Sequence, residues 1–351
     1  MRVYVGLDVA SSKTAVCVID EAGKMILETM VKTHPFAIAG MLKHRFQEII
    51  QVGLETGSVT PWLVHGLRRE GLEVVCIDAM QAHRTLSLKR NKTDSNDARG
   101  IAELVRLGPD WINAVHVKQL ATHHIRTLLA ARSHLVSKRV GLENTMCGML
   151  RPFGGIVQRG GVKPESLRER ILDVTKEVSD RGHDLESSLL PLLGLHRQIV
   201  AQIAIYDKQA EELAKSNPIC RNFMTVPGVG PIVALSFYST IEDPKRFSRS
   251  CDVAAYLGLT PRTYQSGEME RTGRISKRGD EAARLALVQA ATVMLTATKS
   301  WSPLKSWGVQ LAKRTGFNKA KVAVARKLAI VLYRMWLDGT AFQFKSEAVA
   351  A

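Results

Sequence analysis

Two carboxylates three residues apart are the first residues of this sequence that could do chemistry. Asp94 and Asp97 lie in a run otherwise rich in cations. At helical spacing, residues i and i+3 share one face, so both side chains would point the same way and could bind a metal ion. The same pair also suits a helix start, with Asp94 as N-cap and Asp97 as its N3 partner. Caps are far commoner than active sites, so the pair indicates catalysis only if other residues join it.

Two more acidic residues stand where short apolar runs end. Asp8 closes the run that begins at Val3, and Glu55 closes the run at 49–54. In open α/β sheets, ligands gather at the carboxyl ends of strands. Four carboxylates together would offer Mg²⁺ the oxygen ligands it prefers, and two ions about 4 Å apart can hold both oxygens of a phosphodiester displacement. Taken singly, Asp8 and Glu55 are equally well explained as solvated strand-end residues.

The elements that must position these carboxylates form an α/β domain. Short β-branched runs predict three strands in succession, read as an antiparallel meander, and then two strands that alternate with helices. This order predicts a mixed sheet with helices on its faces. The expected elements are strands at 3–7, 14–19 and 25–31, a helix at 35–48, a strand at 49–54, a helix at 60–70, a strand at 73–77 and a helix from 94 through 105.

Size and charge limit the classes of protein. The chain has 351 residues, 45% of them hydrophobic, which suffices for two or three domains with real cores. Lys and Arg number 49 against 33 Asp and Glu, a formal net charge of +16. This excess favours a polyanionic partner, with nucleic acid as the leading candidate, although a basic solvated surface gives the same composition.

The cysteines and the N-terminus favour a cytoplasmic protein. The five cysteines are scattered, odd in number and without metal-ligand spacing, so we expect reduced thiols and no structural zinc. The first residues reach the charge of Asp8 too soon for a signal peptide. No uncharged apolar run reaches the roughly eighteen residues of a membrane span.

The middle of the chain is helical in character, at 117–150 and again at 164–216, with Pro191 and Gly194 expected to interrupt the second stretch. Packing inside one subunit and an intermolecular coiled coil explain the apolar stripe of the first stretch about equally well. We expect an antiparallel helical hairpin that offers a dimerisation surface. The stripe consists of residues seven apart: Leu128, Leu135, Leu142 and Met149.

Two blocks of the C-terminal part suit a phosphate backbone. Residues 226–234 resemble the hairpin of a helix-hairpin-helix element, in which glycines let backbone N–H groups approach a phosphate, although a plain Pro/Gly turn competes equally. A loop at 271–280 carries four cations among small residues. The expected nucleic-acid contacts are Gly228, Gly230, Arg262, Arg271, Arg274, Lys277 and Arg278. Helices are expected to follow at 282–297 and 319–335.

The order, local context and spacing of the carboxylates together resemble a known family. VGLD ending at Asp8, LETG around Glu55 and KTDSNDA around Asp94 and Asp97 are similar to the D-E-D-D set of bacterial insertion-sequence transposases. That family has a RuvC-like, RNase H-type N-terminal domain and is related to the pilin-gene-inverting recombinases. The C-terminal blocks PGVGP, LGLTPR and GRISKRGD resemble the same family, so the resemblance covers most of the chain.

In that family, a serine before the glycine of a C-terminal loop is the nucleophile that becomes joined to DNA, and Ser266 occupies the matching place. Relatives often show Ser-Ser-Gly-Gly, whereas this chain has Gln265 and Glu268 at the outer positions, which removes one candidate serine. Ser276 is the second candidate, with a helix cap as its alternative role. Because Ser266 is far along the chain from the carboxylates, the two parts must meet in one subunit or across a dimer.

The resemblance implies both a fold and an activity. The expected organisation is an RNase H-like α/β catalytic domain at 1–112, a helical coiled-coil assembly region at 113–217, a mostly α transposase domain at 218–340 and a tail at 341–351. The implied activity is cutting and rejoining of donor and target double-stranded DNA through a serine–DNA ester, with Mg²⁺ on Asp8, Glu55, Asp94 and Asp97. The family further implies a non-coding bridge RNA and a dimer or tetramer.

Three other functions are compatible with parts of the sequence. A RuvC-like nuclease would use water as nucleophile and the C-terminal part only as a DNA clamp. An actin-like sugar kinase also begins its first phosphate loop with a run like Gly6-Leu7-Asp8, but no Gly-rich adenosine-binding stretch supports it. A non-catalytic DNA-binding protein would need none of the four carboxylates.

Overall fold

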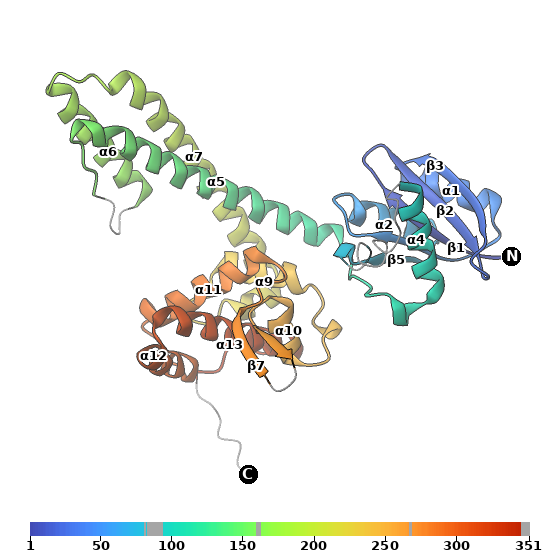
Figure 1. Ribbon diagram of the computed structural model, residues 1–351. Coiled ribbons are helices and arrows are strands. Elements are labelled where there is room, and N and C mark those ends of the chain that lie inside the picture. The colour runs from blue at the N-terminus through green and yellow to red at the C-terminus, as the bar shows by residue number, and fades with distance from the viewer. Residues whose placement is uncertain (81, 83–93, 159–162, 267–268, 345–351) are drawn as a thin grey trace, which may run out of the picture. The chain divides into compact units, whose positions relative to one another are not determined.

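The computed structural model describes residues 1–80, 82, 94–158, 163–266 and 269–344. The chain divides into two compact units, Met1–His123 and His124–Ala351 (Figure 1).

A five-stranded mixed sheet forms the centre of the first unit. Its order is β3-β2-β1-β4-β5, with β1, β2 and β3 antiparallel and with β4 and β5 parallel to β1. The predicted meander and mixed sheet are therefore confirmed. The strands are β1 (Arg2–Val9), β2 (Lys13–Asp20), β3 (Met25–Lys32), β4 (Glu48–Glu55) and β5 (Val74–Ile77).

Helices cover both faces of this sheet, as alternating strand residues require. On one face, Val5 and Leu7 of β1 pack in a core with Ile38 of α1 (Pro35–Arg45) and Leu63 of α2 (Thr60–Arg69). On the other face lies α4 (Asp94–Leu107), whose Ala98 and Ala102 pack against Cys17 of β2. The predicted helix with the aspartate pair is confirmed.

Two neighbouring glycines let α4 approach the sheet at backbone distance. Gly6 and Gly53 are Cα partners on the adjacent parallel strands β1 and β4. A Cβ atom on Gly6 would lie 2.0 Å from the carbonyl oxygen of Ala98, and one on Gly53 would lie 2.2 Å from a methyl group of Val105. No larger residue fits at either position unless the helix moves.

Two long helices of the second unit, α5 (Leu120–Leu150) and α7 (Glu186–Ser216), pack antiparallel. Arg132 pairs with Asp207, and Glu143, eleven residues further along α5, pairs with His196, eleven residues earlier on α7. Opposite displacements of equal length require antiparallel helices in constant register. The predicted helical hairpin is therefore present inside one chain.

The second helical stretch is interrupted, but not at Pro191 and Gly194 as predicted. The break lies at residues 181–185, between α6 (Pro164–Asp180) and α7, where Gly182 has a φ of 92°, and α7 then runs unbroken through Pro191. A proline six residues into a helix loses only one backbone hydrogen bond near the start, which packing can offset. Two residues of the predicted heptad stripe make contacts within the chain, since Leu128 packs on the C-terminal core and Leu142 on the core of α6 and α7.

By length and composition alone, helix α7 is long and apolar enough to cross a membrane. Among the described helices it alone combines sufficient length with a mean hydropathy of 1.3 over an 18-residue window. In this structure Leu189 and Leu193 of α7 pack in a core with α6, and Asp207 pairs with α5. The helix is thus a packing element of the helical unit.

The C-terminal part of the second unit is largely helical, with one β-hairpin. The predicted helices at 282–297 and 319–335 are confirmed as α11 and α13. The predicted loop at 271–280 is confirmed only for residues 276–280, because residues up to Ile275 form a strand. The elements are α8 (Pro218–Phe223), α9 (Pro231–Ile241), α10 (Ser250–Tyr256), β6 (Pro261–Ser266), β7 (Met269–Ile275), α11 (Glu281–Thr296), α12 (Pro303–Thr315) and α13 (Phe317–Asp338).

Separate hydrophobic cores lie within the second unit. One joins the end of α5 with α6 and the start of α7, and the other joins the end of α7 with α8 to α13 around Phe223 and Phe237. The division of the chain at 112, 217 and 340 stays a prediction.

The glycine contact predicts a selective loss of stability. Gly6→Ala should lower the free energy of unfolding by about 1–3 kcal/mol, since the new methyl group meets the backbone of α4. Gly40→Ala is the matched control, because its Cβ meets nothing within 4 Å inside α1, and it should be neutral or stabilising by up to about 1 kcal/mol. Urea unfolding measures both, and equal effects would contradict the close contact.

Thiol chemistry provides a second test of the fold. Cys17, Cys76, Cys147 and Cys220 are buried and Cys251 is exposed. Burial raises the pKa of the Cys220 thiol to about 12, and a protonated thiol is unreactive. At pH 8 we expect Ellman's reagent to label one thiol per native chain and none in Cys251→Ser. Rapid labelling of several thiols in the folded protein would show that the cores are open.

Candidate active site

Asp8 and Glu55 lie at neighbouring carboxyl ends of parallel strands. Leu7 and Leu54 are Cα partners in the register of β1 and β4, and each acidic residue follows directly. Both side chains are half-buried. The strand-end position predicted from the sequence is therefore confirmed for both residues.

Strand alternation puts both carboxylates on the face that α4 covers. Side chains two residues apart share one face of a sheet. Asp8 is two residues from Gly6 and Glu55 is two residues from Gly53, and both glycines face α4. The side chains of Asp8 and Glu55 thus lie at the same edge of the sheet and on the same face, the one that α4 covers.

The direction of α4 brings the aspartate pair to the same edge. Asp94 and Ser95 line a cavity with Ala15, which is the Cα partner of Asp8. At the other end of α4, Arg106 donates a hydrogen bond of 3.3 Å to the carbonyl of Glu21, in the turn between β2 and β3. Helix α4 therefore runs antiparallel to β1, with its first turn beside the carboxyl end of that strand.

Asp94 and Asp97 both belong to the first turn of α4. Asp94 is exposed and Asp97 is half-buried. Asp94 is the first described residue of α4, and the residues directly before it lie outside the described residues, so the N-cap interpretation of Asp94 stays a prediction. Carboxylates in a first helical turn also interact favourably with the helix dipole, so this placement stabilises the helix whether or not they bind a metal ion.

The donor chemistry of these residues fits a hard divalent cation, because all four offer carboxylate oxygens. Among the described residues, however, no three Asp, Glu, His or Cys side chains gather in a group that could hold a metal ion. The backbone thus brings the carboxylates to one edge and one face, whereas these side-chain conformations form no ligand set.

Asp78 is a further strand-end carboxylate that the sequence reasoning missed. It follows β5 directly and is half-buried. The pKa of the neighbouring Cys76 thiol is raised to about 11, mainly by burial, with the opposing effect of Arg68 and smaller raising effects of the negative charges of Asp78 and Glu55. The rule that selected Asp8 and Glu55, an acidic residue closing a predicted strand, would also have found Asp78.

Ser266 is the last residue of β6, where its Cα partner across the hairpin is Met269. It therefore stands at the tip of a two-stranded hairpin. Residues 267 and 268, which include the departure from the family sequence at Glu268, lie outside the described residues.

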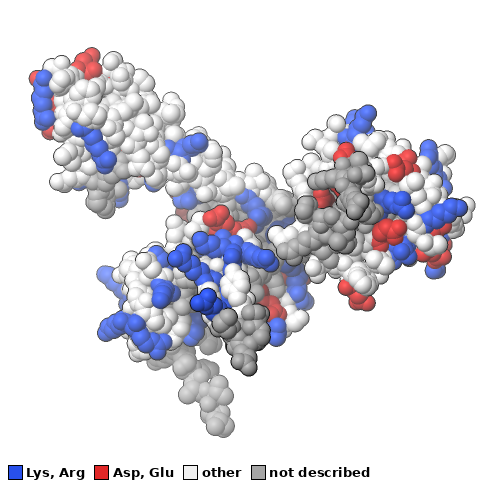
Figure 2. All heavy atoms as spheres, viewed as in Figure 1, with Lys and Arg blue, Asp and Glu red and all other residues white. Residues whose placement is uncertain are grey.

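The cations predicted to contact nucleic acid are exposed on or beside this hairpin, and Figure 2 shows Lys and Arg gathered over this part of the second unit. Arg262 also donates a hydrogen bond of 3.1 Å to the carbonyl of Ser276, which ties the two strands at the base. The exposed cations are Arg262, Arg271, Arg274, Lys277 and Arg278.

The two glycines of the predicted helix-hairpin-helix block have different environments. Gly228 has a φ of 88°, and its Cβ would lie 2.6 Å from the carbonyl of Ala290, so packing against α11 explains this glycine. Gly230 precedes α9 with nothing within 4 Å of its Cβ position. Of these two glycines, Gly230 is the one with open space at a helix start.

Ser276 is not the helix cap that the sequence suggested. Asp280 is the N-cap of α11, and its side chain accepts a hydrogen bond from the backbone N–H of Ala283. The Ser276 hydroxyl instead accepts a hydrogen bond of 3.4 Å from the backbone N–H of Arg278, inside the loop.

Family models match both units of the chain. A DEDD transposase model of the IS110 type matches residues 5–153, and the model described as "Transposase IS116/IS110/IS902 family" matches residues 220–305. A transposase for insertion sequence element IS1328 of Yersinia enterocolitica is 30% identical over 261 residues, which are 73% of this chain and 75% of that protein. The chain belongs to the IS116/IS110/IS902 family of transposases.

Other members of this transposase family align over similar or greater lengths. The transposase for insertion sequence element IS1111A of Coxiella burnetii is 28% identical over 94% of this chain and 88% of its own. A probable family 20 transposase of Pseudomonas aeruginosa is 28% identical over 73% and 75%. Among solved structures, Thermus thermophilus RuvC aligns with 32% of this chain and 98% of its own at 17% identity, with a TM-score of 0.25, which is too low to identify a shared fold.

For this transposase, the carboxylate edge predicts a metal-dependent stability. Mg²⁺ at about 100 times its dissociation constant should stabilise the folded protein by about 2.7 kcal/mol. Asp97→Asn should reduce the increase in thermal midpoint, whereas Asp110→Asn, an exposed aspartate of the same unit, should leave it unchanged. An equal response of both variants to Mg²⁺ would place the binding elsewhere.

Proposed function

We propose that this transposase cuts and rejoins DNA through a covalent ester between Ser266 and a DNA phosphate. The observation that carries the proposal is the pairing of two features: four carboxylates at one edge of a sheet, and a serine at the tip of a hairpin with five exposed cations. Carboxylates serve phosphoryl chemistry through bound cations, and cations serve the phosphate backbone.

In the proposed site, Asp8, Glu55, Asp94 and Asp97 hold Mg²⁺ through their carboxylate oxygens. The bound ion would polarise the scissile phosphate and favour the ionised form of a nearby hydroxyl. The RNase H-like, RuvC-like character of the sheet belongs to the proposal, supported by the antiparallel meander followed by parallel strands.

The Ser266 hydroxyl acts as the nucleophile. The hydroxyl gives up its proton as its oxygen forms a bond to phosphorus, the bond from phosphorus to one deoxyribose oxygen breaks, and that oxygen takes up a proton and leaves as a hydroxyl. The number of phosphate ester bonds is unchanged, so the reverse attack by another DNA hydroxyl can rejoin a strand without ATP. This reaction requires the hairpin and the carboxylates to act on one phosphate.

The hairpin cations hold the DNA backbone. Arg262, Arg271, Arg274, Lys277 and Arg278 are exposed, and each contact to a phosphate releases counterions, so binding should weaken as salt rises. Gly230 at the start of α9 offers further backbone donors, whereas the packing of Gly228 makes it a support for that turn.

The proposal includes partners that the family resemblance implies. These are a non-coding bridge RNA that pairs with donor and target DNA, and assembly as a dimer or tetramer in the cytoplasm. The net charge of +16 supports an RNA partner in addition to DNA. Met149, 45% exposed on the heptad stripe of α5, supports a contact between subunits through a coiled coil.

Removing the Ser266 hydroxyl separates the proposal from its main rival, a nuclease that uses water. Ser266→Ala should abolish the covalent protein–DNA adduct and reduce strand joining by about 10³-fold or more, because the nucleophile is lost. Ser276→Ala is the matched control and should retain adduct formation. Denaturing gels of the protein with labelled DNA and Mg²⁺ measure both quantities. Cleavage and joining that persist in Ser266→Ala without an adduct would favour the water-using nuclease.

A further inference from the structure

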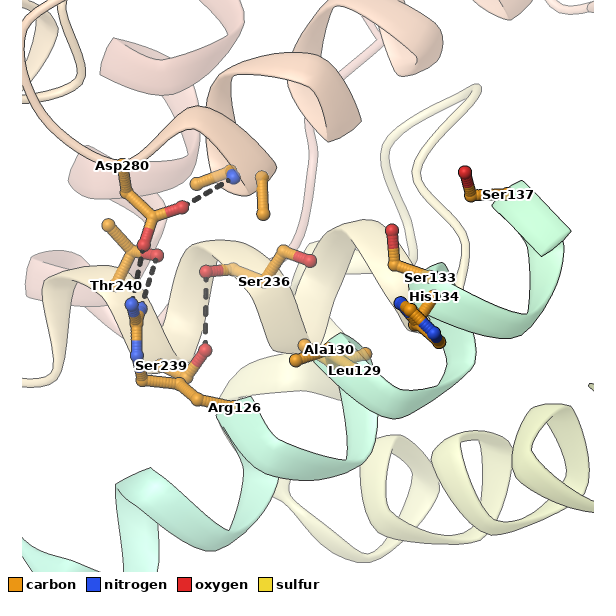
Figure 3. A pocket seen from close by; sticks show the side chains of 12 residues that line it. Arg126, Leu129, Ala130, Ser133, His134, Ser137, Ser236, Ser239, Thr240 and Asp280 are labelled. Carbon is orange, nitrogen blue, oxygen red and sulfur yellow. Dashed lines mark hydrogen bonds and ion pairs between the residues drawn. The ribbon is translucent and has the colours of Figure 1, made fainter.

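An ion pair in the second unit links the long helix α5 to the start of α11. Arg126 of α5 contacts Asp280 with 2.7 Å between Nη2 and Oδ2 (Figure 3). A second nitrogen of the same guanidinium, Nη1, donates a hydrogen bond of 3.4 Å to the hydroxyl of Thr240 at the end of α9. One side chain therefore contacts two elements that are distant in sequence, and the proposed chemistry assigns it no role.

Asp280 performs two tasks at once. While Oδ2 meets Arg126, Oδ1 accepts a hydrogen bond of 2.9 Å from the backbone N–H of Ala283 and so caps α11. A carboxylate with both oxygens engaged has a fixed orientation. The position of α5 is thus coupled to the first turn of α11.

The segment before Asp280 connects it rigidly to the hairpin that carries Ser266. The backbone N–H groups of Ser276 and Lys277 donate hydrogen bonds of 2.8 and 3.1 Å to the carbonyls of Thr260 and Gly258. A Cβ on Gly279 would lie 1.9 Å from the carbonyl of Tyr256. Strand β7 and the segment from Ile275 to Asp280 are therefore held closely against the end of α10 and the residues that follow it.

We propose that Arg126 is a positioning residue, which orients the β6–β7 hairpin, and with it Ser266, by holding Asp280. This role rests on the proposed function of Ser266. Arg126 touches neither DNA nor the reacting atoms in this proposal and acts on the hairpin through Asp280.

The surroundings of the pair indicate a role in orientation more than in folding. The side chain of Arg126 is 34% exposed and that of Asp280 is 16% exposed. Beside them lies a cavity of about 410 Å³, lined by hydroxyl groups that include those of Ser236 and Ser239 (Figure 3). A partly exposed ion pair adds little stability, and water can fill the space that a shortened side chain leaves. Loss of Arg126 should therefore alter the orientation of the hairpin without unfolding the protein.

Two substitutions at this position, with one control, test the role on the full-length protein. Arg126→Ala removes both contacts, whereas Arg126→Lys keeps the charge facing Asp280. Arg132→Ala is the matched control, because Arg132 lies on the same helix and pairs with Asp207 of α7 instead. The measurements are amide hydrogen exchange, affinity for a DNA duplex, thermal midpoint, and the rate of Mg²⁺-dependent protein–DNA adduct formation.

We expect Arg126→Ala to speed amide exchange in residues 276–283, and to slow adduct formation by about 10–100-fold, as a misplaced nucleophile does. DNA affinity and thermal midpoint should change little. Arg126→Lys should recover most of the adduct rate, and Arg132→Ala should resemble the wild type in both exchange and rate.

The proposal is overturned if Arg126→Ala leaves exchange in 276–283 unchanged, or if Arg132→Ala slows adduct formation equally. Absence of an adduct in the wild type would instead contradict the Ser266 nucleophile. In that case the exchange measurement still decides whether Arg126 holds the base of the hairpin, so the two failures are distinguishable.

Discussion

The contact between α4 and the glycine-lined strands is the constraint on which the candidate site depends. Gly6 and Gly53 stand side by side, and the backbone of Ala98 lies where a Cβ on Gly6 would be. Such close packing fixes the distance of α4 from the sheet and its direction across the strands. Since α4 begins at Asp94, its first turn and the ends of β1 and β4 come to one edge. Acidic residues that are far apart in sequence are thereby brought to the same edge of the sheet.

Local pattern was sufficient to predict most of the first unit. Alternating β-branched runs predicted all five strands, and acidic residues at strand ends predicted the edge where Asp8 and Glu55 lie. The side-chain conformations could not be predicted, because they depend on packing between elements that are distant in sequence. Asp78 escaped notice because it matched no family position, although burial and strand order place it beside Cys76.

The second unit was harder to predict because tertiary contacts outweigh local signals there. The run 271–280 is basic and rich in small residues, which is typical of a loop, but pairing with Pro261–Ser266 makes residues 269–275 a strand. Pro191 suggested a break, yet packing carries α7 through it. Gly228 looked like a phosphate contact, and only the approach of Ala290 reveals its packing role. Arg126 gave no signal at all, because its partner is 154 residues away in the chain.

The central claim is that the carboxylate edge binds a divalent ion, and it can be tested directly by anomalous diffraction from crystals soaked in Mn²⁺, a common substitute for Mg²⁺ at oxygen-rich sites. The account predicts an anomalous peak within about 2.0–2.5 Å of oxygens from Asp8 and at least two of Glu55, Asp94 and Asp97. A fully occupied Mn²⁺ site elsewhere, with no peak at this edge, would contradict it.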